Sequence, residues 1–210
     1  MAIHSPSGPP LSEPVSPRGD RRLIVTFHDL APHTQRPCQE LLMLLAELGV
    51  PRASLFVARP EEGAGSILER PFFLRWLRSL AEEGHEVRLA AGDGAGEERM
   101  LAEAGLTARD VEYVLAPGYL YMPRQDARVA ISTITFSTRS FLGRAVSPLV
   151  GRARFAANRR QPVLSVSVHP GDLYEHRVRR ALVSVLQRAL ADREPVTYGE
   201  LVRAASPSQV

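Results

Sequence analysis

LIVTF at residues 23–27 decides the fold, and HDLAP at residues 28–32 follows it directly. An unbroken run of apolar and β-branched residues is typical of a strand that is buried on both faces of a parallel sheet. The sequence then turns polar, so we predict that the strand ends at Phe27 and that residues 28–32 form a loop. Thr34 offers a helix N-cap, and apolar residues recur at helical spacing over residues 35–48.

The same succession of apolar run, polar loop and helical pattern recurs along the chain. Strand patterns occupy residues 53–58, 85–90, 112–115, 131–136 and 163–168. Helical patterns follow Ser66, occupy residues 97–104 and 174–190, and begin again at Thr197, where Glu200 completes a capping box. Residues 140–158 are ambiguous because Pro148 interrupts a helical pattern. This order predicts an α/β fold with βα units around a parallel sheet or barrel.

Two polar clusters fall where such folds place their sites, at the carboxyl ends of predicted strands. His28 and Asp29 follow the first strand, where they could bind a metal ion or work as acid and base. The alternative is that Asp29 caps the next turn through its carboxylate. His169 follows the strand at 163–168 and could be a general acid or a structural histidine. Asp172 could cap the next helix.

The composition is that of an ordinary globular domain, since 44% of the residues are hydrophobic and 23% are charged. We expect one domain at residues 23–204, a disordered leader at 1–22 and a tail at 205–210. The chain has no apolar run long enough for a membrane span or a secretory signal. The one cysteine, Cys38, lies in a helical pattern and is expected to be a buried small hydrophobe. These features favour a cytoplasmic protein.

The basic residues are all arginine, and they are unevenly placed. No acidic residue lies between Asp126 and Asp172. The arginines of that segment are Arg128, Arg139, Arg144, Arg152, Arg154, Arg159 and Arg160. This Arg-rich segment predicts either an anion-binding face or a surface of solvated charges. The glycine-rich residues 92–96 lack the spacing of a phosphate-binding loop. We do not expect nucleic acid as a partner.

Several stretches occur in an order that resembles a known family: LIVTFHDLAPHT, GVPRASLFVARP, RWLRSLAEEGHEV, APGYL, FSTRS and SVSVHPGDL. Over most of its length the chain resembles the polysaccharide-deacetylase-like branch of bacterial proteins related to the NodB-type deacetylases. The resemblance implies a distorted (β/α) barrel, here shortened. It also implies a divalent metal ion, usually zinc, and hydrolysis of the N-acetyl group of a sugar. A carbohydrate or another N-acetylated small molecule would then be the partner.

The resemblance also assigns roles to individual residues. Asp29 matches the metal-binding aspartate, and His28 stands where better-known members have a catalytic aspartate. His169 matches the late histidine that acts as an acid. The residues assigned to the pocket are Pro117, Gly118 and Asp172.

The metal motif departs from the family. Ala90 and Gly94 stand where two histidines would bind the metal, and neither residue has a side-chain donor atom. A site reduced to Asp29 should bind zinc poorly, because tight binding needs several protein ligands at once. His33 and Asp93 are the candidate substitute ligands.

Three hypotheses follow. The first is a deacetylase-like protein with an eroded metal site, no bound metal and weak or no hydrolase activity. The second is an active metal-dependent sugar deacetylase or amidase that uses substitute ligands. The third is a non-catalytic protein that binds an anionic partner through the Arg-rich segment.

Overall fold

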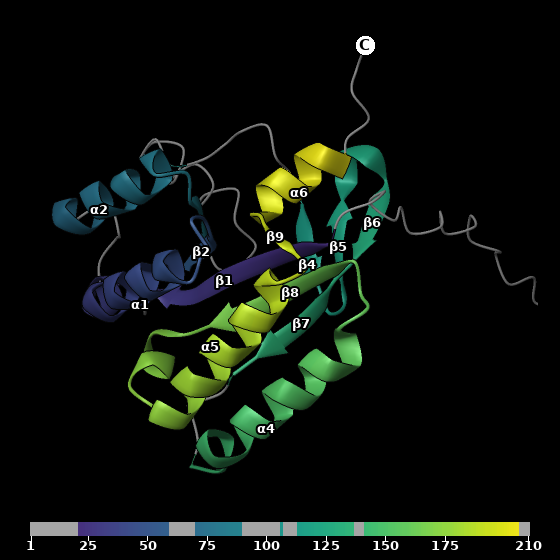
Figure 1. Cartoon of the computed structure of the whole chain (residues 1–210). Helices are drawn as coiled ribbons and strands as arrows, with labels where there is room; N and C mark the ends of the chain where they lie inside the picture. The colour runs from purple at the N-terminus through teal and green to yellow at the C-terminus, as the bar shows by residue number, and fades with distance from the viewer. Residues whose placement is uncertain (1–20, 59–69, 90–105, 107–112, 137–140, 206–210) are drawn as a thin grey trace, which may run out of the picture.

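The computed structural model describes residues 21–58, 70–89, 106, 113–136 and 141–205 (Figure 1). Its main sheet has the strand order β3-β2-β1-β8-β7, with β9 paired to the first residues of β1. The strands are β1 (Arg22–Leu30), β2 (Ser54–Val57), β3 (Glu86–Leu89), β7 (Ser132–Thr135), β8 (Val163–Val168) and β9 (Glu194–Pro195). Each neighbouring pair in this sheet is parallel, which confirms the predicted parallel α/β sheet.

A closed barrel stays a prediction. Within the described part of the chain, β3 and β7 stand at the two ends of the strand order and are not paired to each other. Predicted features outside the described residues include the leader up to residue 20, the helix at 97–104 and the glycine-rich loop at 92–96.

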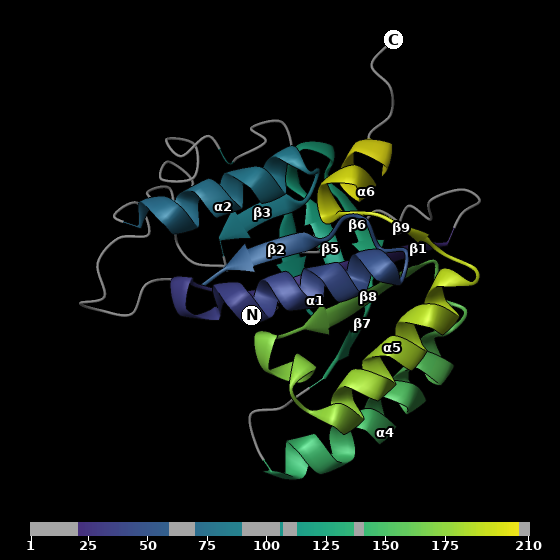
Figure 2. The ribbon, with the colours of Figure 1, turned by 60° about the vertical axis from the view of Figure 1, so that its left-hand side comes forward.

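Four of the helices in the described part of the chain cover one face of the main sheet (Figure 2). They are α1 (Gln35–Glu47), α2 (Pro71–Glu82), α4 (Phe141–Asn158) and α5 (His176–Leu190). Side chains alternate between the faces of a strand, so Leu23, Val25 and Phe27 of β1 all point into this helical layer. They pack in one buried cluster with residues from each of these helices, such as Leu41 and Val185. Burial of this cluster is the main term that stabilises the fold.

The opposite face is covered by a small antiparallel sheet and by α6 (Tyr198–Ala205). The small sheet contains β4 (Val114–Ala116), β5 (Tyr119–Met122) and β6 (Ala127–Ala130). Ile24 of β1 and Phe56 of β2 pack with Leu120 and Val129 of this sheet. The domain therefore has three layers, and the second core explains why β1 is apolar on both faces.

Two helices differ from the prediction. Helix α2 begins at Pro71, where proline fits the first turn because its missing N–H would have no partner there. Ser66, the predicted cap, lies outside the described residues. Helix α4 runs through Pro148 without a break. The helix packs closely on the sheet, since a Cβ on Gly151 would stand 2.6 Å from the Phe136 ring.

None of the described helices is both long enough and apolar enough to cross a membrane.

Candidate functional site

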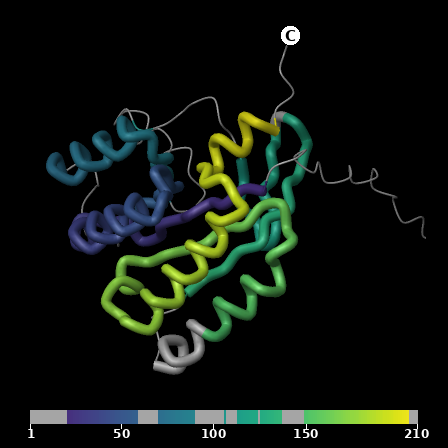
Figure 3. The backbone as a smooth tube through the Cα atoms, in the orientation of Figure 1, coloured from purple at the N-terminus to yellow at the C-terminus, as the bar shows by residue number. Residues whose placement is uncertain are grey.

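The pairing of β1 with β8 brings the two predicted histidines together. The strands β1 and β8 run side by side in the backbone tube (Figure 3). Phe27 is in register with Val168, so His28 and His169 are the next residues at the carboxyl ends of these parallel strands. Their rings are stacked with centroids 5.5 Å apart and planes 26° apart. Both side chains are partly buried. The two polar clusters of the sequence thus form one site at this edge of the sheet.

Phe56 extends this pair into a row of three rings. It lies on β2, the other neighbour of β1, and its ring is 5.1 Å from the His28 ring with planes 9° apart. Phe56 is 6% exposed, so it forms a fixed wall against which the His28 imidazole is oriented. Sequence reasoning missed this residue. In β2, side chains alternate between the two faces, so Phe56 lies on the same face as Ser54. The sequence alone does not show which face that is.

His28 and Asp29 belong to β1 itself, which corrects the predicted loop at residues 28–32. Strand β1 continues to Leu30, with a register shift between Phe27 and Leu30 where β1 uses one residue more than β2, as in a β-bulge. Asp29 has a φ of 60°, a left-handed conformation that aspartate tolerates better than most residues. The Thr34 hydroxyl donates to the Asp29 carbonyl oxygen at 2.8 Å and fixes the bend.

Asp172 lies behind His169 in the turn η4 (Pro170–Leu173). Its Oδ2 accepts the backbone N–H of His169 at 2.9 Å and lies 3.8 Å from the imidazole Nδ1. The predicted capping of the next helix is wrong, because α5 is preceded by Glu175 and Asp172 reaches back to His169 instead. Asp172 is fully buried, and its Oδ1 has no hydrogen-bond partner among the described residues. This carboxylate therefore holds the backbone of His169 in place at the end of β8.

The other predicted site residues lie apart from the ring row or outside the described chain. His33 is exposed on the short turn η1 (Pro32–Thr34). Pro117 and Gly118 form the exposed turn between β4 and β5, where Gly118 has a φ of 85°. Asp93, like Ala90 and Gly94, lies outside the described residues.

The described side chains do not by themselves supply a zinc site. No group of three or more His, Cys, Asp or Glu side chains that could hold a metal ion occurs among them. The lone pairs of an imidazole lie in the ring plane, so the stacked rings of His28 and His169 do not direct them at one point between the rings. A zinc site needs three or four converging donors, and the described donors do not meet that requirement.

Cys38 is buried, as the sequence predicts. Burial, with a smaller contribution from the Asp29 carboxylate, raises the pKa of its thiol to about 11. The thiol therefore stays protonated and acts as a packing group near the bulge.

A second polar cluster lies on the same face, under α6. Glu86 Oε2 accepts the Ser54 hydroxyl at 2.7 Å and the Gly199 N–H at 3.1 Å, and its Oε1 accepts the Tyr113 hydroxyl at 2.8 Å. Burial, helped by the Glu86 charge, raises the pKa of Tyr113 well above its ordinary value. Burial also raises the pKa of Tyr198 to about 12. These groups join β2, β3 and α6 and support the sheet beneath the ring row.

No family model matches the chain, and no curated protein matches it. Among solved structures, the Xyl-CE4 domain of a multidomain xylanase from the hindgut metagenome of Trinervitermes trinervoides is similar to it. The two share 13% sequence identity with a TM-score of 0.49, and the match covers 88% of this chain and 91% of that domain.

Proposed function

We propose that this chain is a polysaccharide-deacetylase-like protein with an eroded metal site. Its site at the carboxyl ends of β1 and β8 binds an N-acetylated sugar or a similar small amide and hydrolyses it weakly or not at all. The observation that carries the proposal is the row of Phe56, His28 and His169 rings across three adjacent parallel strands. The ordered motifs that resemble the family support it independently.

The ring row suits a small ligand that is both polar and apolar. The imidazoles of His28 and His169 can each donate to or accept from the hydroxyl and amide groups of a sugar. Ring faces and edges, with Phe56 behind them, offer an apolar surface for the C–H groups of the ligand. Both histidines are only partly buried, so a ligand can reach them from solvent.

The same residues allow weak acid and base chemistry. As the oxygen of water bonds to the amide carbon, His28 accepts a proton from that water. His169 gives a proton to the leaving nitrogen as the C–N bond breaks, so the products are acetate and a free amine. Asp172 positions His169 through the hydrogen bond that its Oδ2 accepts from the His169 N–H at 2.9 Å. Catalysis stays weak, because a metal ion would contribute several kcal/mol by polarising the carbonyl and the described residues do not form its site.

The test is binding of di-N-acetylchitobiose to the full-length protein after treatment with a chelator, measured by NMR titration. Binding should persist without metal and weaken at least tenfold in His28→Ala and His169→Ala. His33→Ala is the matched control, since His33 is exposed and lies outside the ring row, and it should bind as the parent does. Equal affinity in all four proteins, or no binding by the parent protein, would refute the proposal.

A further inference from the structure

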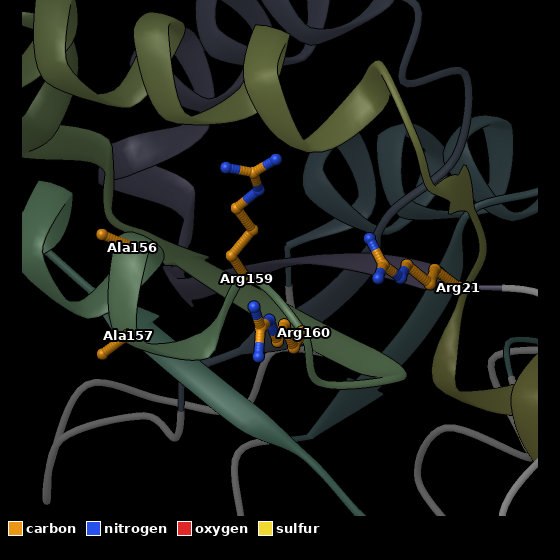
Figure 4. A pocket seen from close by; sticks show the side chains of 5 residues that line it. All are labelled: Arg21, Ala156, Ala157, Arg159 and Arg160. Atoms are coloured by element: carbon orange, nitrogen blue, oxygen red, sulfur yellow. The ribbon is translucent and has the colours of Figure 1, made fainter.

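A hollow of about 550 Å³ opens at the opposite edge of the main sheet, far along the strands from the histidines. Its lining residues are Arg21, Ala156, Ala157, Arg159 and Arg160 (Figure 4). Arg21 immediately precedes β1, and Arg159 and Arg160 lie between α4 and β8. The hollow therefore lies at the amino ends of two paired strands, whereas the ring row lies at their carboxyl ends.

The charge around this hollow is unbalanced. Arg21 forms an ion pair with Asp192, which supplies one negative charge. The side chains of Arg159 and Arg160 are exposed and make no hydrogen bond or ion pair with any described residue. The residues that line the hollow thus include three arginines and no carboxylate, while Asp192 pairs with Arg21 and also lies 3.8 Å from Arg193 Nε. Like charges that line one hollow repel each other, so an anion bound in the hollow would be stabilised.

The buried side chain of Arg193 holds the backbone at residues 159–161 in place. Arg193 is 5% exposed and donates from Nη2 to the Arg159 carbonyl oxygen and from Nη1 to the Gln161 carbonyl oxygen, both at 2.8 Å. The Gln161 N–H also donates to the Asn158 carbonyl oxygen at 3.0 Å. A fixed turn lowers the conformational entropy that is lost when a ligand binds. Ala156 and Ala157 have small side chains, which leaves the hollow open.

We infer that this hollow is a binding site for a small molecule that carries two or more linked phosphate groups. The guanidinium fork matches the geometry of phosphate oxygens and can bond to them in pairs. A diphosphate carries enough negative charge to bridge several guanidinium groups at once, which a single phosphate cannot do as well. The volume lies within the range of small-molecule pockets. This site would be separate from the deacetylase-like site and independent of it.

The experiment is isothermal titration of the full-length protein with inorganic pyrophosphate at low salt, with orthophosphate and succinate as comparisons. We expect one site per chain, with pyrophosphate bound at least tenfold more tightly than orthophosphate or succinate. Arg159→Gln and Arg160→Gln should each weaken binding about tenfold. The matched control is Arg154→Gln, an exposed arginine of the same helix region that does not line the hollow. It should change affinity by less than twofold.

Asp192→Asn should raise the affinity for pyrophosphate, whereas Arg159→Gln and Arg160→Gln should lower it. This substitution of Asp192 removes the carboxylate that competes for Arg21, so pyrophosphate should bind more tightly than to the parent protein. Thermal melts of each variant show whether it is folded. Equal weakening in all three arginine variants would mean diffuse attraction to net charge, and that result would overturn the site. Equal affinity for pyrophosphate and orthophosphate, tighter binding of succinate, or weaker binding by Asp192→Asn would overturn it as well.

Discussion

The imidazole of His28 lies between two other rings, with His169 at 5.5 Å on one strand and Phe56 at 5.1 Å on another. The arrangement follows from the strand order, because β1 lies between β2 and β8. The register shift between Phe27 and Leu30 then interrupts the regular pairing of β1 with β2 at His28 and Asp29. A stacked histidine in this position has its orientation set by the fold before any ligand binds.

The contact between Phe56 and His28 can be tested in solution. A proton above an aromatic ring is shielded, so Phe56→Leu should move the imidazole proton signals of His28 downfield. The swap keeps an apolar side chain of similar size and should cost about 1 kcal/mol of stability. Phe72→Leu is the matched control because Phe72 is 75% exposed on α2. If both variants leave the His28 signals unchanged, the ring row does not exist in solution.

Asp172 should contribute to stability through its hydrogen bond to the His169 N–H. A charged acceptor of this kind contributes about 1.5–3 kcal/mol, so Asp172→Ala should lower the free energy of unfolding by that order. Asp172→Asn keeps an acceptor oxygen and should lose less. Urea denaturation at pH 7 measures both, with Glu47→Gln at the exposed end of α1 as the control. An Asp172→Ala protein as stable as the control would contradict the contact.

Glu86 should hold α6 against the sheet. In Glu86→Gln the amide has a single acceptor oxygen for the Ser54, Gly199 and Tyr113 donors, so at least one buried donor loses its partner. We expect a loss of about 1–3 kcal/mol and faster hydrogen exchange of the α6 amides. Glu82→Gln, exposed on α2, is the control. Unchanged exchange in α6 would show that the cluster does not anchor that helix.

His85 should make stability depend on pH. Its Nδ1 accepts the Ala53 N–H at 3.1 Å, and burial lowers the pKa of His85 below its ordinary value of 6.5. The unfolded chain therefore binds a proton at a higher pH than the folded protein does. The contribution of His85 is full above pH 6.5 and is lost as the pH falls through the lower folded pKa.

Denaturation at pH 7.5 and pH 5 measures this effect as a difference between the parent and His85→Asn. The asparagine can still accept the Ala53 N–H but does not titrate, so the variant should lose less stability on acidification. The prediction fails if the parent and the variant lose the same free energy over this range.

The parts of the fold that were predictable from sequence depend on strong local patterns. The strands at 23–27 and 163–168 are unbroken apolar runs, and α5 has a clear helical stripe that includes Val178, Leu182 and Val185. The capping box was also visible, and the Thr197 N–H does bond to the Glu200 carboxylate at 2.8 Å. The meeting of His28 and His169 could be inferred because both follow strands of one parallel sheet.

Other features had no local signal. Strands β5 and β6 are four residues each and pair with their neighbours in a small sheet. They are too short for the alternation of a strand to be read reliably from the sequence. The bond from Gly199 to Glu86 spans 113 positions, and nothing in either segment points to the other. Phe56 was hidden for a different reason, since its strand is buried on both faces and a run of apolar residues does not show which face meets the site.

The measurement that tests the central claim most directly is the metal content of the purified full-length protein after loading with zinc, cobalt or nickel and exhaustive dialysis. Elemental analysis should find well below one ion per chain, with no difference between the parent, Asp29→Ala and His169→Ala, because the described donors do not converge. About one tightly held ion in the parent that is lost in both variants would contradict the account. That result would mean that Asp29 and His169 belong to a rebuilt metal site completed by residues outside the described chain.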